Sequence, residues 1–386
     1  MKYDIYLDNA ATTEPSIEVI KKITDSLKKN WGNASSLHKK GFKAFKYIEQ
    51  VREKLANVVG SDADEILFTS GGTEANNLAI FGVAKTNKIK KRGKNKIITT
   101  MVEHASVLEP CRKLQESGFE VIYLKPTKQG TITDKQIIDV LDENTLLVSM
   151  MSVNNETGQI FSVEKIKNLI NRKSPDVLLH VDAAQSFLKI PINVNEFKCD
   201  LLTITAHKAH GPQGIGALFV RKGIKLCPLL FGGEQEKKLR PGTKNIALIL
   251  GFGEILLNNK VIKENFKRVK KINDFFKEKI LQIDGVILNE VENPFPYILN
   301  FSVPGLKSEI ILNFLSERNI FVSSAAACSK NKRSHVLTAM GLPNEYIDSA
   351  IRISFSNQTT FEEIKEFLYE LEIAVKNLKD LKTAVK

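Results

Sequence analysis

Residues 205–216 read TAHKAHGPQGIG, and they follow directly on the mostly apolar run 200–205. Short apolar runs bounded by turn residues are typical of buried strands in a parallel sheet. Ligands of open α/β sheets bind where such strands end, and the glycines after Lys208 let the backbone approach a ligand closely. The position of Lys208 therefore indicates a covalent amine anchor, because a lysine in suitable surroundings forms Schiff bases with carbonyl compounds.

Two other interpretations of this segment stay open when it is taken alone. Lys208 is also compatible with a solvated lysine in a surface loop. A dinucleotide-binding loop fits less well, because the glycines follow the pattern GxxGxG rather than GxGxxG.

The chain around this segment alternates short strands with longer helices. Helical spacing over residues 44–59 ends at Gly60, and helices are expected from about Thr73 and Ala105. This alternation predicts a mostly parallel sheet. The expected strands are 66–69, 96–100, 120–124, 146–150, 178–181 and 201–205.

The pattern of strands and helices in the sequence changes after about residue 255. A long charged helical stretch leads to a short strand at 297–301, and the last helix opens with a capping box of Thr360 and Glu363. We expect an α/β protein with a large domain over residues 15–255. Residues 1–14 and 256–386 are expected to form a smaller α+β domain.

Composition limits the class of protein. The 386 residues are 42% hydrophobic and 26% charged, and the N-terminus has no signal-peptide pattern. The apolar runs are too short to span a membrane, so we expect a cytoplasmic protein without membrane association. The four cysteines at 111, 199, 227 and 328 form no CxxC pair and no metal-ligand spacing.

The net charge of +12 is the one feature that hints at nucleic acid. Lysines are nevertheless scattered along the chain, and the one dense basic cluster, residues 88–96, has no interleaved aromatic residue of the kind that stacks on bases. We expect no direct nucleic-acid binding, and docking of an acidic partner is the alternative use of the charge.

Two further segments match the chemistry of a phosphorylated ring. Asp182, at the end of an apolar run, could pair with a protonated ring nitrogen, although a lone aspartate there is more often a helix cap. The glycines of residues 70–77, SGGTEANN, stand between a strand and a helix, where backbone N–H groups bind phosphate. The lack of a Walker lysine argues against a nucleotide triphosphate, and an ordinary helix start is the plainer interpretation.

His104 and Cys328 complete the set of candidate residues. His104 follows a strand and could stack on a ring and move protons, although a lone histidine is more often a satisfied polar residue. Cys328 lies among small residues and is followed by Lys330 and Lys332, which favour its thiolate. Its polar surroundings weaken the alternative of a small buried core residue.

Together these segments resemble the cysteine desulfurase family, of the NifS and IscS type, within the fold-type I, class-V aminotransferase-like enzymes that use pyridoxal 5′-phosphate (PLP). The resemblance runs from residues 6–13, YLDNAATT, to residues 352–360, RISFSNQTT. It implies a seven-stranded, mostly parallel sheet flanked by helices, with a smaller domain that carries the cysteine loop.

The resemblance also implies a role for each site residue. Lys208 holds PLP as a Schiff base, His104 stacks on its ring, Asp182 meets the ring nitrogen and Gln185 meets the phenolic oxygen. Thr243 would reach the phosphate from the neighbouring subunit, which implies a homodimer with its sites at the interface. The remaining residues hold the phosphate (Gly72, Thr73, Thr205 and His207) or the substrate (Asn9, Asn155 and Arg352).

The implied reaction converts L-cysteine to L-alanine and leaves a persulfide on Cys328. An acceptor protein, such as an iron–sulfur scaffold or a tRNA-thiolating protein, would then take the sulfur. Cys328 stands 24 residues before Arg352, which resembles the branch with a long cysteine loop. Glu234 and Ser356 replace glycines that are common in the family. The alternatives are a selenocysteine lyase, another class-V aminotransferase and, least favoured, a non-catalytic sulfur-relay protein.

Overall fold

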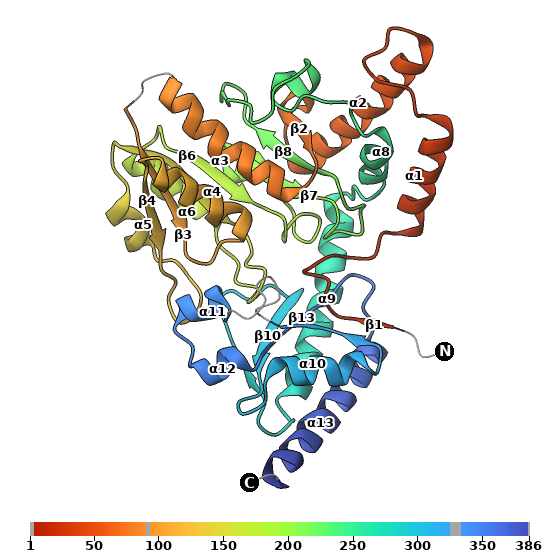
Figure 1. Ribbon diagram of the computed structural model, residues 1–386, viewed down its shortest axis with the longest axis vertical. Coiled ribbons are helices and arrows are strands. Elements are labelled where there is room, and N and C mark those ends of the chain that lie inside the picture. Colours follow the sequence, from red (N-terminus) through yellow and green to blue (C-terminus); the bar gives the residue numbers. More distant parts are fainter. Residues whose placement is uncertain (1–3, 90–92, 325–332, 385–386) are drawn as a thin grey trace.

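The computed structural model of the chain describes residues 4–89, 93–324 and 333–384 (Figure 1). Its larger part is a seven-stranded sheet with the strand order β2-β8-β7-β6-β5-β3-β4. The strands are β2 (Ile66–Thr69), β3 (Lys96–Thr100), β4 (Glu120–Leu124), β5 (Thr145–Met151), β6 (Leu178–Asp182), β7 (Leu201–Thr205) and β8 (Gly216–Val220).

The sheet confirms the six strands expected from the sequence and adds β8. Neighbours from β4 to β7 pair in parallel, whereas β8 is antiparallel to both β2 and β7. Since β2 and β7 both run opposite to β8, they run in the same direction as each other. The carboxyl ends of β2, β3, β5, β6 and β7 therefore lie at one edge of the sheet.

Helices cover the sheet because their apolar residues recur at helical spacing. Helix α2 ends as expected at Gly60, whose left-handed backbone (φ 74°) lets its N–H reach Ala56 O. The helices are α1 (Ile17–Lys29), α2 (Lys39–Val59), α3 (Gly72–Ile89), α4 (Ala105–Glu116), α5 (Asp134–Val140), α6 (Val163–Lys173), α7 (Val194–Phe197), α8 (Ile246–Glu254), α9 (Asn259–Ile280), α10 (Ser308–Ser316), α11 (His335–Met340), α12 (Asn344–Asp348) and α13 (Phe361–Ala384), with short 3₁₀ turns at Ala63–Glu65 and Gln235–Lys238.

The smaller part joins the two ends of the chain. The first strand pairs in parallel with a strand more than 300 residues later, through Ile5 and Ile320. A four-stranded sheet of order β12-β13-β10-β9 lies beside this pair. The strands are β1 (Ile5–Tyr6), β9 (Ile287–Leu288), β10 (Ile298–Ser302), β11 (Ile320–Phe321), β12 (Ser323–Ser324) and β13 (Ala350–Ser354).

The last helix begins as the sequence predicts. The Thr360 N–H donates to Glu363 Oε2 (2.7 Å) and the Glu363 N–H donates to Thr360 Oγ1 (3.2 Å). Ile364, Phe367 and Leu371 of α13 are fully buried in the core of the smaller part. The start of the helix is thus fixed by hydrogen bonds, and its first half by apolar burial.

The division into two domains stays a proposal. Apolar residues from 5–10 and 269–375 form one buried cluster, while the main cluster around the large sheet spans residues 19–350. The large cluster also includes Val336 and Ile347, from α11 and α12, so these helices contribute to the larger apolar core although they follow residue 256 in the sequence. Within the described residues, no helix is both long and apolar enough to cross a membrane.

Candidate active site

A cavity of about 490 Å³ lies at the carboxyl edge of the large sheet, where the smaller part covers it. That volume is within the range of small-molecule and cofactor sites. The cavity brings together most of the residues that the sequence singled out: Gly72, Thr73, His104, Asn155, Asp182, Gln185, Thr205, His207, Lys208 and Arg352.

The strand ends explain why these side chains meet. Asp182 is the last residue of β6 and Thr205 is the last residue of β7, three positions before Lys208. Gly72 begins α3 just after β2, and His104 caps α4 just after β3. Because these strand ends lie at one edge, short connections are enough to bring distant parts of the sequence together.

A buried hydrogen-bond chain holds the carboxylate of Asp182. Asp182 Oδ1 accepts from the Ala184 N–H (2.9 Å), and Oδ2 accepts from Asn76 Nδ2 (2.8 Å). The same Asn76 nitrogen donates to Ser106 Oγ (2.8 Å), which lies 2.8 Å from His104 Nδ1. Asn76 thereby links Asp182, expected at the nitrogen of a cofactor ring, to His104, expected to stack on that ring.

The sequence interpretation passed over Asn76 and Ser106, although both line the cavity. Asn76 stands three residues after Thr73 and Ser106 stands two after His104. Residues three apart share one face of a helix, so the segment 70–77 did contain a signal for Asn76. This spacing alone indicates no chemical role for Asn76, because the role depends on Asp182, which only the fold places beside it.

The hydrogen bonds of His104 define its neutral form. The Ser106 N–H donates to His104 Nδ1 (3.1 Å), so the proton of the neutral ring belongs on Nε2. Burial lowers the pKa of His104, and the nearby Lys208 charge lowers it further. His104 is therefore a neutral imidazole at pH 7.

The residues expected to bind a phosphate line the cavity from the start of α3 and from the segment that begins at the end of β7. Gly72 and Thr73 line the cavity from the first turn, where backbone N–H groups have no intrahelical partner. The hydroxyl of Thr205 is buried, with no hydrogen-bond partner among the residues described. Burial lowers the pKa of His207 to about 4, with Lys208 and Lys189 contributing, so its ring is neutral.

Gln185 lies in the cavity, and its amide nitrogen is already hydrogen-bonded within the protein. Its Nε2 donates to Ala10 O (2.9 Å), and its buried Oε1 has no partner within the described part of the chain. This orientation presents an acceptor. Donation to a phenolic oxygen, the role expected from the resemblance, requires the opposite orientation of the amide.

Arg352 enters the cavity from β13 with its guanidinium held on two sides. Its Nη2 donates to Asp8 Oδ1 (2.6 Å) and its Nη1 to Asn155 O (2.9 Å). Asp8 also lines the cavity, and sequence reasoning did not assign it a role. The buried Nε of Arg352 has no partner in the described residues, and the two bonds above engage only two of the five N–H groups of the guanidinium.

Two of the expected residues are not among those lining the cavity, and a third falls outside the described residues. Asn9 is buried beside the cavity, and its Nδ2 donates to Tyr6 O (3.0 Å) and Ser354 O (2.9 Å). Thr243 is exposed, and the described lining of its own chain's cavity does not include it. Cys328 lies outside the described residues.

Glu103, next to His104, is a buried acid with a testable effect on stability. Burial raises its pKa to about 8, although Thr100 donates to its Oε1 (2.8 Å). The folded state therefore favours the protonated acid. The stabilisation is complete below the unfolded pKa of about 4.5 and is lost as the pH rises through 8.

We expect the substitution Glu103→Gln to stabilise the protein at alkaline pH, because glutamine has no charge to bury. The gain in the free energy of unfolding should be about 3 kcal/mol larger at pH 8 than at pH 5. Urea unfolding at the two pH values measures it. Glu116→Gln, at the exposed end of α4, is the control and should show no such difference; equal effects of the two substitutions would contradict the assignment.

Comparison with known proteins identifies the family. The model of the class-V aminotransferase family matches residues 5–367. A cysteine desulfurase IscS of Dictyoglomus turgidum is 40% identical over 386 residues, covering 99% of this chain and 97% of the relative. A solved NifS-like protein superposes with a TM-score of 0.91 at 34% identity, over 97% of this chain and 100% of that one. The chain belongs to the cysteine desulfurases of the class-V aminotransferase family.

Another solved relative is described as SspA in complex with cysteine. It is 35% identical, with a TM-score of 0.79, over 92% of this chain and 99% of its own. Enzymes of this family depend on PLP. The cavity fits that cofactor. Asp182 lines it at the end of β6, and Gly72 and Thr73 line it at the start of α3. The buried hydroxyl of Thr205, at the end of β7, has no partner in the described residues.

Proposed function

We propose that the cavity is the active site in which this desulfurase converts L-cysteine to L-alanine and places the sulfur on Cys328. The observation that carries the proposal is the convergence of Lys208, Asp182 and Arg352 on one cavity. These are an amine, a ring-nitrogen partner and a carboxylate binder, which together are what an amino acid on a PLP enzyme requires.

The residues that would hold the cofactor divide by chemistry. Lys208 would bind its aldehyde, Asp182 its ring nitrogen, and Thr73, Thr205 and His207 its phosphate. When bound, PLP supplies an electron-withdrawing ring that stabilises negative charge at the substrate's Cα. Asn76 keeps Asp182 oriented, since it donates to Oδ2 at 2.8 Å.

Lys208 and His104 would handle the protons of the reaction. The Lys208 amine takes the proton from Cα, which requires an amine that is close to Cα and neutral. His104 is neutral because burial lowers its pKa, and its Nε2–H is the group that can donate. Arg352 and Asn155 orient the substrate by holding its carboxylate.

Cys328 would accept the sulfur. Its thiolate attacks the substrate sulfur, a new S–S bond forms, and the carbon–sulfur bond breaks with its electron pair left on carbon, which a proton then quenches. L-cysteine and the Cys328 thiol thus give L-alanine and a persulfide, with no external oxidant. Ser323, five residues before Cys328 in the sequence, lines the cavity, which supports this role.

A reducing compartment such as the cytoplasm suits this chemistry, because Cys328 has to stay a thiol between turnovers. The persulfide would pass to an acceptor protein of an iron–sulfur or tRNA-thiolation system. The positive net charge of the chain, +12, supports an acidic docking surface on that acceptor.

We propose a homodimer with each site completed by the partner subunit. Thr243 is exposed and lies away from its own chain's described cavity lining, which supports a role in the other site. Large apolar side chains are exposed near α1, α2 and the segment before Thr243, as expected of a surface that a second copy covers. They are Ile17, Ile20, Leu27, Trp31, Leu37, Phe42, Phe45, Leu230 and Phe231.

Incubation with L-cysteine tests the function directly. We expect the PLP-loaded protein to release alanine and to carry one additional sulfur on Cys328, detected by mass spectrometry. Cys328→Ser should lose the persulfide and at least about a hundredfold of the alanine release, because serine is a far weaker nucleophile.

The other outcomes separate the alternatives. Transfer of the amino group to a keto acid without alanine release would make the protein an aminotransferase and Cys328 incidental. A rate with selenocysteine far above that with cysteine would make it a selenocysteine lyase. A protein that binds PLP and does neither would fit the relay alternative.

A further inference from the structure

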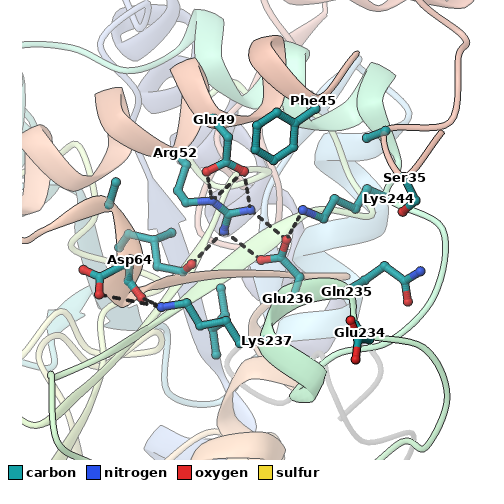
Figure 2. A pocket seen from close by; sticks show the side chains of 14 residues that line it. Ser35, Phe45, Glu49, Arg52, Asp64, Glu234, Gln235, Glu236, Lys237 and Lys244 are labelled. Atoms are coloured by element: carbon teal, nitrogen blue, oxygen red, sulfur yellow. Dashed lines mark hydrogen bonds and ion pairs between the residues drawn. The ribbon is translucent and has the colours of Figure 1, made fainter. Parts of the chain in front are cut away.

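A second cavity, of about 660 Å³, lies outside the active site and contains a buried ion cluster (Figure 2). Its walls are the α2 residues Phe45, Glu49 and Arg52, the entry to β2, and part of residues 232–245, here called the Thr243 loop. Glu236 and Lys244 of this loop point toward Arg52. The cavity thus lies where the Thr243 loop meets the large domain.

The Glu236 carboxylate is hydrogen-bonded or ion-paired to three residues, Arg52, Phe68 and Lys244. Arg52 grips it with two parallel hydrogen bonds, each 2.7 Å long, and the Phe68 N–H donates to Oε2 (2.9 Å). Lys244 Nζ lies 3.1 Å from Oε1. The Glu236 side chain is only 2% exposed and that of Arg52 only 8%. Such buried, bidentate pairs fix geometry more strictly than exposed ones.

Arg52 is itself fixed from the other side. Its Nε donates to the carboxylate of Glu49 (3.1 Å), its Nη1 also donates to Ile66 O (2.7 Å), and its guanidinium lies over the Phe68 ring at 4.7 Å. These contacts fix the position of the Arg52 guanidinium, and the guanidinium in turn fixes the position of the Glu236 carboxylate. This cluster is a structural clamp and no anion site, since its positive charges already face the carboxylates of Glu49 and Glu236.

The backbone beside the clamp is strained. Glu236, Lys237 and Lys238 have φ values of 44°, 58° and 64°, three successive non-glycine residues in the left-handed region. Such residues persist where the surrounding structure holds them, and they often mark functional segments. Here the surroundings are the Arg52 clamp and the bond from Lys237 Nζ to Asp64 O.

The middle of the Thr243 loop is tied to α3 of its own chain, the helix expected to bind the phosphate. Arg240 Nε donates to Glu74 Oε1 (3.0 Å), and Glu74, in the first turn of α3, accepts from the Ser70 N–H (2.7 Å). Thr243 itself is exposed, and it lies between Arg240 and Lys244, which pair with Glu74 and Glu236. The loop therefore presents Thr243 on the surface in a conformation that its base determines.

We propose that Glu236 and Arg52 are positioning residues for the partner's active site, because they hold the Thr243 loop in the shape that delivers Thr243 to the partner's cofactor phosphate. This inference rests on the proposed homodimer. It makes each site depend on an ion pair in the other subunit.

Mixed dimers distinguish this arrangement from a local structural role. In the first, a Lys208→Ala chain pairs with a Glu236→Ala chain, so the single Lys208-bearing site receives an unaltered Thr243 loop. In the second, a chain with both substitutions pairs with an unaltered chain, so the Lys208-bearing site receives the altered loop. Two different affinity tags allow each mixed dimer to be purified.

The readout is the dissociation constant of PLP at the Lys208-bearing site, followed by absorbance, which requires no turnover of cysteine. We expect this dissociation constant to be at least tenfold larger in the second dimer than in the first. In the first dimer it should stay within about twofold of its value in a dimer of a Lys208→Ala chain and an unaltered chain. Equal weakening in both, weakening only in the first, or a chain that is monomeric by light scattering would overturn the proposal. Failure to release alanine from cysteine would instead overturn the proposed function and leave this readout intact.

Two variants guard against a folding artefact. Glu236→Gln keeps the shape of the side chain without its charge, so it should fold where Glu236→Ala does not and show the same asymmetry with a smaller effect. Lys167→Met removes another buried ion pair, with Asp200 at 2.7 Å, which includes no residue of the Thr243 loop or of its clamp. It should lower thermal stability and leave the affinity for PLP equal in both arrangements.

Discussion

Alanine release from cysteine is expected to fall by at least about 10⁴-fold when Lys208 is replaced by alanine, the upper end of the range for a single acid–base group. The loss is large because the Lys208 amine has two proposed roles: it holds the cofactor covalently and takes the proton from Cα. The PLP phosphate and ring keep their other partners, so the variant should still bind PLP, with the absorbance of the free aldehyde. Alanine assays and absorbance spectra of the same sample measure both quantities.

Lys208→Arg is the control that separates charge from nucleophilicity. Arginine keeps the positive charge but stays protonated in proteins, so it should be as inactive as Lys208→Ala. The exposed Lys225→Ala should retain full activity. Activity of Lys208→Ala above about one per cent of the unaltered enzyme would show that another group supplies the base.

Local sequence patterns were enough for the strands of the large sheet, because each is short, apolar and bounded by turn residues. Strand β8 was missed for a physical reason. It follows the Lys208 segment directly, with no helix between β7 and β8, so it does not fit the alternation of strands and helices that predicted the other strands. The pairing of Ile5 with Ile320 is a product of the whole fold.

In the candidate site, too, some residues could be predicted from local sequence patterns and others only from the fold. Lys208, His104 and Asp182 stand at strand ends in recognisable segments, so the sequence could place them near one another. Asp8 could not be assigned from the sequence, because its importance comes from the 2.6 Å bond to Arg352, 344 residues later. The Arg52–Glu236 clamp is hidden in the same way, since neither residue stands out until the fold buries both.

The carboxylate of Asp182 should account for most of the electronic help that the protein gives to the cofactor, so Asp182→Asn is the second large effect that we expect. Removing the charge should lower kcat for alanine release about 10³-fold, equal to ~4 kcal/mol of transition-state stabilisation. KM for cysteine should change little, because Arg352 and Asn155 hold the substrate carboxylate. Steady-state kinetics of the PLP-loaded variant measure both constants.

The fold should tolerate this substitution. Asparagine keeps the acceptor for the Ala184 N–H, and the unpaired Oδ1 of Asn76 can turn to accept from the new amide. Asp200→Asn is the matched control: Asp200 is also buried but precedes β7, at the opposite edge of the sheet, where it pairs with Lys167. Its loss should lower stability and leave kcat unchanged. A fall in kcat of less than tenfold for Asp182→Asn, with PLP bound, would mean that another group keeps the ring nitrogen protonated.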